Sequence, residues 1–493
     1  MAGLWSSKVE KAIGKSQSTA KSNAREISRQ EFDTAVDYAE DNMLQDTIAA
    51  LQMRYPAAQE GGRFTGIQPV TVPIVARYLD EAATAYTRGV YRTLVDAEGN
   101  PDEELTKELA TVLDDVGYDL TLNKVERYAI LLKSCGLWVQ DCEDEPIEAI
   151  PYLPQDIYPI SEGDSLRDPA AQKSYLGFIL AERQGEEDVG SPTLRTYTAV
   201  GAEGFLTFRS TDPHQLGRQV TETKNPYKMQ MLTIWHPRKP AFALLPDGVP
   251  SIFTLNREIN VLWSVLLDIM RFQGGALLTQ VLADPQSVTA KRAVGVRHPW
   301  TGHPGESAHY ESASNDFAGL VSSLQAVVKL VMLSLRQSPS DFSLEGAQIA
   351  SGFAKIIDSI PKVEARDERI KWFSIMERRT WSRLAAVLVA KKILPEKVKG
   401  YRLQVEYDGI RIPEAIQERI AREKHEIELG LTTAAEILAE QNAITIDQAR
   451  EQIRANKQEN RSGAAGASIA GLVNASAMEE EPEETEEEEL ALQ

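Results

Sequence analysis

The sequence feature that most constrains the fold is a pair of apolar helical patterns separated by a short insert. The first pattern covers about 256–273 and stops at two glycines. The second covers 314–337 and opens with a Ser-Asn-Asp capping sequence. Proline and glycine punctuate residues 275–313 between them. The chain is therefore expected to form two helices that flank a compact, β-like insert.

The second helical pattern has two distinct faces. Its apolar residues keep helical spacing and are Phe317, Leu320, Val321, Leu324, Val327, Val328, Val331 and Leu335. A polar stripe at intervals of seven lies on another face and comprises Ser322, Lys329 and Arg336.

A mixed block of helices and strands is expected before this unit. Helical patterns cover 30–54, 73–94, 100–115 and 122–134. Short β-branched and aromatic stretches then indicate strands at 137–141, 148–152, 175–182, 194–200, 205–209 and 230–235. Because Gly201-Ala-Glu-Gly204 is typical of a hairpin turn, the sheet is expected to be mostly antiparallel.

After the second helix, a loop leads into a long helical run over 347–393 with an interruption expected at Pro361. A strand pattern at 401–407 and two or three polar helices follow, one of them starting at a capping box of Thr433 and Glu436. The predicted fold class is α+β, mostly helical.

Both ends of the chain are poor in large apolar residues. Residues 1–30 are predicted to form a mobile arm that orders on a partner. Residues 462–477 have the composition of a linker, and 478–493 form an acidic tail.

The charge of the chain limits its possible partners. The 493 residues carry a formal net charge of −20, of which the nine glutamates between Glu479 and Glu489 contribute −9. Proteins that bind nucleic acid tightly are generally basic, so any DNA contact should be local or loose. No run of eighteen apolar residues occurs, and no membrane contact is expected.

Motifs that carry catalysis or hold cofactors are absent from the sequence. It has no phosphate-binding loop, dinucleotide fingerprint, nucleophile elbow or metalloprotease helix. The three histidines His298, His303 and His309 would form a metal site or a pH switch, or else are polar loop residues; their spacing matches no standard ligand pattern. Cys135 and Cys142 fit buried, unreactive thiols in a reducing compartment. We expect no enzyme, no cofactor and no metal.

The segment 362–383 mixes basic and acidic residues at helical spacing. It would serve as a basic patch for nucleic acid, or its charges would form ion pairs within and between subunits. The mixed signs favour ion pairs, with subunit contact as the preferred interpretation.

The order of these elements resembles the portal protein, or head-to-tail connector, of tailed bacteriophages. Gly136-Leu-Trp-Val-Gln followed by Leu153-Pro-Gln-Asp-Ile-Tyr-Pro159 is similar to the wing strands and their Pro-x-Asp-Ile-x-Pro turn. Tyr310-Glu-Ser-Ala is similar to the exit from the clip. Ser351-Gly-Phe-Ala-Lys355 is similar to the Ser-Gly-x-Ala start of the returning helix. The resemblance covers about 30–460.

The resemblance implies a wing, stem, clip and crown architecture assembled as a cyclic ring. It assigns the chain as 1–30 flexible N-terminal arm, 31–250 wing, 251–274 first stem helix, 275–313 clip, 314–337 second stem helix, 338–350 tunnel loop, 351–395 returning wing helix, 396–470 helical crown and 471–493 disordered acidic tail.

The resemblance also implies a function. Twelve subunits would form a ring at one capsid vertex of the virion, assembled in the host cytoplasm, through which double-stranded DNA passes during packaging and ejection. The implied partners are the major capsid and scaffolding proteins, the terminase large subunit and the neck or adaptor proteins. Twelve helices about 10 Å wide, set side by side, enclose a bore of roughly 28 Å, which admits a duplex.

The implied sites lie in the channel and on the clip. The channel lining would comprise Lys329, Arg336, Ser340, Asp341, Phe342, Ser343 and Leu344. Lys329 and Arg336 would place sparse basic rings in the bore, or else pair with acids of a neighbour. The clip docking surface would comprise Lys291, Arg292, Arg297 and Trp300, although Trp300 fits equally well as a core residue of the insert.

A competing interpretation is an acidic capsid-assembly scaffold or chaperone without a DNA channel. Such a protein would share the acidic tail and the helices. It would not need the helix–insert–helix unit.

Overall fold

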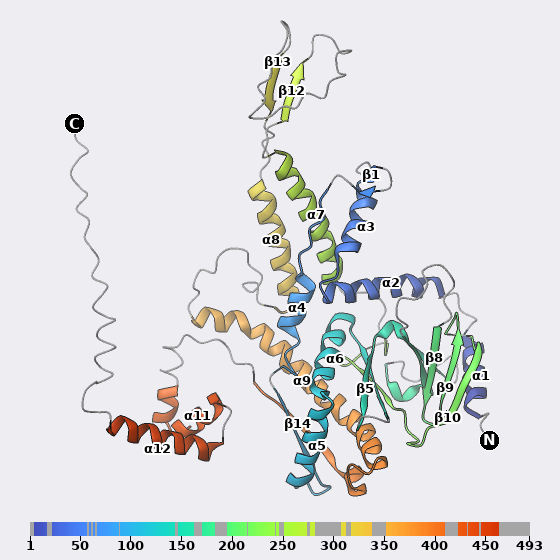
Figure 1. Cartoon of the computed structure of the whole chain (residues 1–493), viewed down its shortest axis with the longest axis vertical. Coiled ribbons are helices and arrows are strands. Elements are labelled where there is room, and N and C mark those ends of the chain that lie inside the picture. The colour runs from blue at the N-terminus through green and yellow to red at the C-terminus, as the bar shows by residue number, and fades with distance from the viewer. Residues whose placement is uncertain are drawn as a thin grey trace. The chain divides into compact units, whose positions relative to one another are not determined.

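The computed structural model shows a mixed fold of helices and strands, in agreement with the expected α+β class (Figure 1). It describes residues 4–16, 22–56, 59–60, 63–64, 67–87, 89–142, 146–161, 170–182, 195–213, 215–241, 243–245, 251–273, 277–281, 307–311, 317–337, 352–409, 423–430, 432–442 and 445–462. The chain divides into two compact units, one of residues 1–350 with 356–411 and one of 351–355 with 412–493.

The larger unit contains most of the described helices. They are α1 (Leu4–Ser16), α2 (Ser22–Ala39), α3 (Leu44–Arg54), α4 (Ile74–Ala82), α5 (Glu103–Asp115), α6 (Tyr118–Leu132), α7 (Ser251–Gln273), α8 (Phe317–Ser334) and most of α9 (Gly352–Ala390). The cap of α5 is Asp102, whose carboxylate accepts a hydrogen bond from the Leu105 N–H at 3.1 Å.

The strands pair antiparallel throughout the described residues, as the hairpin signals predict. One sheet has the order β10 (Arg218–Lys224), β9 (Gly204–Ser210), β8 (Arg195–Gly201), β7 (Gly177–Ala181) and β6 (Ile157–Ile160). A second has the order β11 (Leu232–Trp235), β4 (Cys135–Gln140) and β5 (Glu148–Tyr152). Three strand pairs complete the set: β14 (Arg402–Tyr407) with β3 (Val90–Val95), β12 (Leu277–Val281) with β13 (Ser307–Glu311), and β1 (Gln59–Glu60) with β2 (Arg63–Phe64).

Three helix predictions were wrong in part. The helix expected over 73–94 ends at Ala82, and 90–95 form β3, because Gly89 turns the chain with a φ of 97° and β14 supplies a partner strand. The helix expected over 30–54 is broken at Asp41, which has a φ of 60°. The expected interruption at Pro361 is absent, since α9 continues through it and loses only the hydrogen bond of the missing N–H.

The apolar core has three parts. The largest gathers residues of α2, α4, α5, α6 and α9 around fully buried side chains such as Trp235 and Phe373. A second cluster, with Phe178 and Leu232 among its members, joins the five-stranded sheet to the three-stranded sheet. A third lies on the five-stranded sheet beneath α1. The prediction that residues 1–30 form a mobile arm was wrong for α1, because Trp5 and Val9 of this helix are buried in the third cluster.

The smaller unit contains α11 (Ala434–Asn442) and α12 (Ile446–Ser462). The predicted capping box opens α11: Glu436 N–H donates to the Thr433 hydroxyl at 3.2 Å and Thr433 N–H to the Glu436 carboxylate at 2.8 Å. The larger unit extends to residue 411 and keeps β14, whereas the crown was expected to begin at 396. The predicted tail, 471–493, lies outside the described residues.

Candidate functional site

The helix α7 is held to the body of the larger unit by a ladder of three small polar side chains. Asn256, Asn260 and Ser264 are spaced by four residues, share one face of the helix and are fully buried. Their side-chain oxygens accept hydrogen bonds from the N–H groups of Val75, Val72 and Val70 at 3.0, 2.9 and 2.8 Å. This polar ladder fixes α7 against the segment that leads into α4 and against the first turn of α4.

The polar ladder satisfies backbone groups that no sheet reaches. The Asn256 amide also donates to the Val72 carbonyl at 2.8 Å, so both polar groups of Val72 are paired. A buried N–H without a partner costs about 1–3 kcal/mol. An apolar residue at any of the three positions would therefore leave a backbone N–H unpaired and destabilise the fold. Sequence reasoning missed the ladder, although small polar residues at i, i+4 and i+8 inside an apolar helix are a readable signal.

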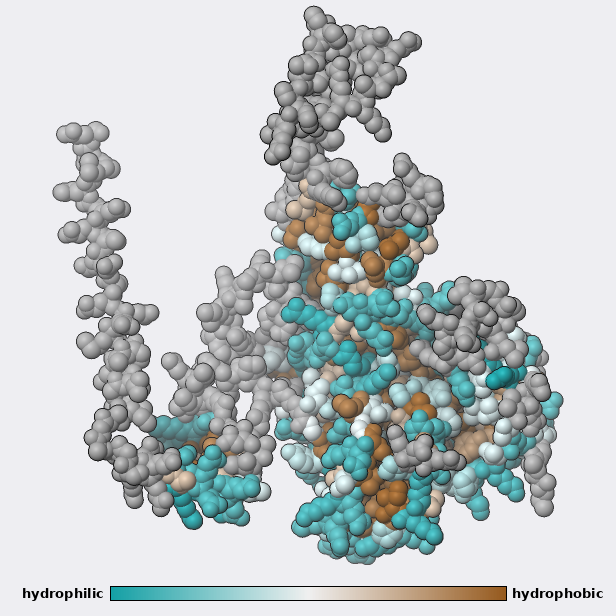
Figure 2. All heavy atoms as spheres, in the orientation of Figure 1, coloured by the Kyte–Doolittle hydropathy of each residue, from teal (hydrophilic) through white to brown (hydrophobic). Residues whose placement is uncertain are grey.

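The helix α8 presents an apolar stripe to solvent. Val327, Leu330 and Leu333 follow one another at intervals of three and are 43%, 68% and 57% exposed. Met332, on the opposite side, is fully buried in the main core. Figure 2 shows apolar surface over the part of the larger unit that Figure 1 labels α7 and α8. An exposed apolar stripe of this kind is typical of a surface that another protein covers.

The helix α7 adds to the exposed apolar surface. Leu262, Leu267 and Met270 are each about two-fifths exposed, although the polar ladder and the core bury another face of the helix. The two helices predicted to flank the insert therefore both combine a buried face with an exposed apolar one.

The two ends of the insert between α7 and α8 form a pair of antiparallel strands. β12 pairs antiparallel with β13, with Leu277 opposite Glu311 and Val281 opposite Ser307. His309 lies on β13 opposite Thr279, whereas His298 and His303 lie outside the described residues. The predicted docking residues Lys291, Arg292, Arg297 and Trp300 also lie outside them.

Of the predicted channel residues, the structure describes two. Lys329 is half-buried on α8. Arg336 is exposed and forms an ion pair with Glu368 of α9 at 3.1 Å, both side chains being more than half exposed. Exposed pairs of this kind stabilise weakly, by about 0–1 kcal/mol. The other five predicted residues, 340–344, lie outside the described residues.

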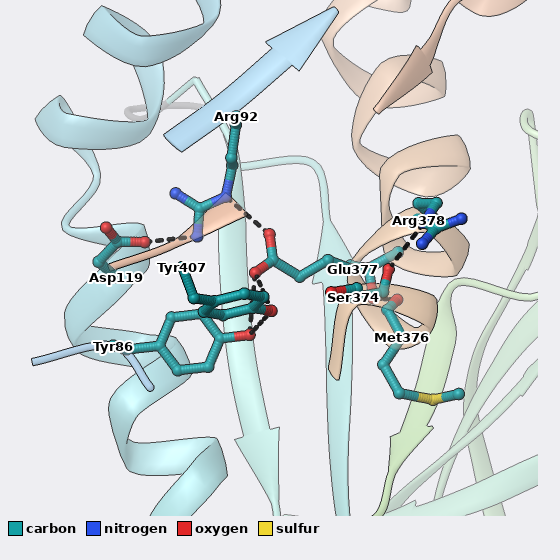
Figure 3. A network of polar contacts seen from close by, with 9 residues as sticks. Tyr86, Arg92, Asp119, Ser374, Met376, Glu377, Arg378 and Tyr407 are labelled. Carbon is teal, nitrogen blue, oxygen red and sulfur yellow. Dashed lines mark hydrogen bonds and ion pairs between the residues drawn. The ribbon is translucent and has the colours of Figure 1, made fainter. Parts of the chain in front are cut away.

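The middle of α9 is anchored by a buried polar network (Figure 3). Glu377, 1% exposed, accepts hydrogen bonds from Arg92 at 2.7 Å and from the hydroxyls of Tyr86 and Tyr407 at 2.9 Å. Arg92 also binds Asp119 of α6 at 2.6 Å. The network therefore ties α9 to β3, β14 and α6.

The electrostatics of this network favour a charged arginine and neutral tyrosines. Burial opposes the charge of Arg92, but Glu377 and Asp119 together raise its pKa above the ordinary value. Burial, and then the neighbouring Glu377, raise the pKa of Tyr86 and of Tyr407. The raised pKa values favour the protonated hydroxyls, which donate to Glu377.

A second buried carboxyl group lies close to α9. Glu126 of α6 accepts a hydrogen bond from the Ala85 N–H at 3.0 Å, and the Arg369 side chain of α9 lies 3.9 Å away. Burial raises the pKa of Glu126 to about 7, although Arg369 and the backbone donors oppose the shift. This carboxyl group changes charge near neutral pH.

The charged segment 362–383 finds many of its partners within the chain. Lys362 pairs with Glu81, Glu377 with Arg92, and Arg383 donates to the Gln230 carbonyl. Arg379 lies over the Trp372 ring. The interpretation as ion pairs therefore holds within the chain, while subunit contact at this segment stays a prediction.

The described part of the chain lacks features of a metal site and of a membrane span. No cluster of three or more His, Cys, Asp or Glu residues suited to a metal ion occurs there. Cys135 is fully buried, and burial raises its pKa; Cys142 is half-buried. None of the helices described is long and apolar enough to cross a membrane.

No protein-family model matches the chain, and no curated protein matches it. Among solved structures, the chain is similar to a chain in the neck of an empty gene transfer agent particle, with 12% identity, a TM-score of 0.42 and coverage of 76% of this chain and 91% of that one. It is also similar to a chain in the virion of a native gene transfer agent particle, with 12% identity, a TM-score of 0.39 and coverage of 80% and 99%.

Proposed function

We propose that the chain is a phage-type portal protein, which assembles into a ring of about twelve subunits and forms a DNA channel at one capsid vertex. The observation that carries the proposal is the chain order of α7, the β12–β13 hairpin, α8 and α9, combined with the exposed apolar stripe of α8. A helix pair around a hairpin supplies a stem and a clip, and the exposed stripe supplies a face for the neighbouring subunit.

The anchoring of these helices suits a ring that carries load. The polar ladder fixes α7 to the body, and the buried network around Glu377 fixes α9. A helix held in this way presents its exposed face in a constant direction, as repeated contacts around a ring require.

The charge of the chain suits a conduit better than a tight DNA binder. Twelve chains of −20 would carry formally −240. Such a surface disfavours adhesion of phosphates, so DNA would slide rather than stick. The ion pair between Arg336 and Glu368 would lower the positive charge that Arg336 contributes to a bore, and Lys329 would then be the stronger basic ring.

The proposal assigns the remaining partners by position. The clip surface of Lys291, Arg292, Arg297 and Trp300 would dock the terminase during packaging and the neck or adaptor proteins afterwards. Residues 340–344 would line the narrowest part of the channel. The chain would act as a structural component of the virion, without catalysis.

Assembly is tested by electron microscopy and native mass measurement of the purified protein. The parent chain should form rings with a central hole and a mass near twelve subunits. Leu330→Glu with Leu333→Glu should keep the fold but lose the rings, because each charge would be buried at the contact. Leu120→Glu is the matched control, since Leu120 is a 79% exposed leucine of α6 outside the stripe.

Two results would count against the proposal. A parent chain that stays monomeric at high concentration and at every salt concentration would exclude the ring. A stripe variant that assembles like the parent would exclude α8 as the contact.

The clip and the tunnel loop are tested separately from assembly. Arg292→Ala with Arg297→Ala should keep rings and block attachment of the motor or neck. Shortening 340–345 should keep rings and lower the DNA packaged per particle. If both variants package and retain DNA like the parent, these two assignments are wrong.

A further inference from the structure

The five-stranded sheet carries a slot that fits one indole ring. Gly177, Gly201 and Gly204 line it, and the Trp5 side chain of α1 fills it. A methyl group added at Gly201 would overlap the Trp5 ring, and one added at Gly177 or Gly204 would lie 3.0 or 3.3 Å from it. The slot therefore depends on the absence of a side chain at Gly201. At Gly177 and Gly204 the backbone carbonyl oxygens of Val200 and Thr223 lie nearer to an added methyl group than the indole does, so the sheet itself also requires glycine there.

Other contacts orient α1 over the slot. The Trp5 indole N–H donates to the Ala199 carbonyl at 3.4 Å, and the Ser6 N–H to the Glu222 carboxylate at 3.4 Å. Lys8 forms an ion pair with Glu203, at the turn between β8 and β9. Val9, one helical turn after Trp5, is fully buried on the same sheet.

The cluster that α1 completes is separate from the main core. Trp5 and Val9 pack with residues of the sheet, such as Tyr158, Tyr197 and Phe208. The next helix, α2, instead contributes Phe32 and Tyr38 to the main core. Five residues, 17–21, join the two helices. The cluster beneath α1 is therefore distinct from the core to which α2 contributes.

We infer that α1 is an exchangeable arm, and that the slot of one copy takes the Trp5 helix of another copy. A second copy is the matching occupant for two reasons. The slot is shaped for this indole, and Glu203 and Glu222 complement Lys8 and the Ser6 N–H of α1. In a ring with heterologous contacts, each arm would link its subunit to one neighbour, and the links would close around the ring. The inference rests on the proposed oligomer only for the proximity of the neighbour.

Crosslinking between Lys8 and Glu203 distinguishes arms that dock within a chain from arms that dock between chains. Both side chains are accessible, at 40% and 50% exposure. Lys8→Cys and Glu203→Cys are made in separate chains, each with Cys142→Ser so that the buried Cys135 is the remaining native thiol. The two full-length chains are co-expressed and treated with a short bismaleimide.

Exchange predicts a crosslinked species of two chains in the co-expressed sample. Adding Trp5→Ala to the Lys8→Cys chain should abolish it. Glu98→Cys, an exposed position in the turn after β3, replaces Glu203→Cys as the control partner and should give no such species. In a single chain that carries both Lys8→Cys and Glu203→Cys, exchange predicts a ladder of covalent oligomers.

Three results would overturn the inference: crosslinks in the doubly substituted chain that stay within the monomer mass, two-chain species that persist after Trp5→Ala, or equal crosslinking with the Glu98→Cys control. Native mass measurement of the same samples separates this inference from the proposed function. Rings without crosslinks between chains would refute exchange alone, whereas such crosslinks without rings would support exchange and refute the ring.

Discussion

Replacing Glu377 should destabilise the larger unit more than any exposed charge on the same helix. Its carboxylate is the shared acceptor for Arg92, Tyr86 and Tyr407, and both Glu377 and Arg92 are nearly inaccessible to water. Glu377→Leu leaves the buried guanidinium without its main partner. Breaking a buried ion pair from one side costs about 3–5 kcal/mol.

The structure places the expected value at the lower end of that range. Arg92 keeps Asp119 at 2.6 Å, and the two tyrosine hydroxyls remain 3.1 Å apart and can bond to each other. We therefore expect Glu377→Leu to lower the free energy of unfolding by about 3 kcal/mol. Tyr86→Phe or Tyr407→Phe should each cost about 1 kcal/mol, because one neutral hydrogen bond is lost.

Urea unfolding followed by tryptophan fluorescence measures these changes. The variants are compared in the background of Leu330→Glu with Leu333→Glu and at one protein concentration, because assembly would add to the apparent stability. Glu364→Gln is the matched control, because Glu364 is an exposed glutamate of α9 that is not part of the network. It should change the free energy of unfolding by less than about 0.5 kcal/mol. A Glu377→Leu variant as stable as this control would refute the reasoning.

Three further predictions follow from other parts of the chain. The pKa of Glu126 is about 7 in the folded chain and near 4.5 in the unfolded chain, so between these values the folded chain holds one more proton. The free energy of unfolding should therefore fall by up to about 3 kcal/mol as the pH rises through this window. Unfolding measured from pH 4 to 8 should lose this slope in the Glu126→Gln variant. Trp5→Ala should lower the free energy of unfolding by about 3 kcal/mol. Gly201→Ala should destabilise the Trp5→Ala chain far less than the parent, because the atoms nearest to the added methyl group all belong to the indole. Equal destabilisation in both chains would contradict the slot. Truncation after Ala477 removes the glutamate-rich segment, which offers little apolar surface to a contact, so rings should persist in microscopy, and loss of rings would show that the tail takes part in assembly.

Local sequence patterns predicted the elements whose formation depends on residues close together in the chain. The antiparallel hairpin at 201–204 and the capping box of α11 each depend on residues a few positions apart, and each is present. The two helices around the insert were predicted for the same reason, because their 3.6-residue periodicity needs no knowledge of the partner.

Elements that depend on distant partners were missed. Val90–Val95 was assigned to a helix because its strand partner, Arg402–Tyr407, lies about three hundred residues later in the chain. The network around Glu377 joins residues from four separate elements, and no local pattern marks them as neighbours. Glu126 was missed for the same reason, since its burial depends on the packing of α6 against α4 and α9.

The N-terminal arm shows why low apolar content is a poor guide to mobility. Trp5 and Val9 are buried, and their spacing of four places them on one face of α1. The compensating signal is in the sheet, where a glycine is costly for a strand and Gly201 lies directly beneath the indole. A glycine that weakens a strand indicates close approach of another group, and at Gly201 that group is the Trp5 ring.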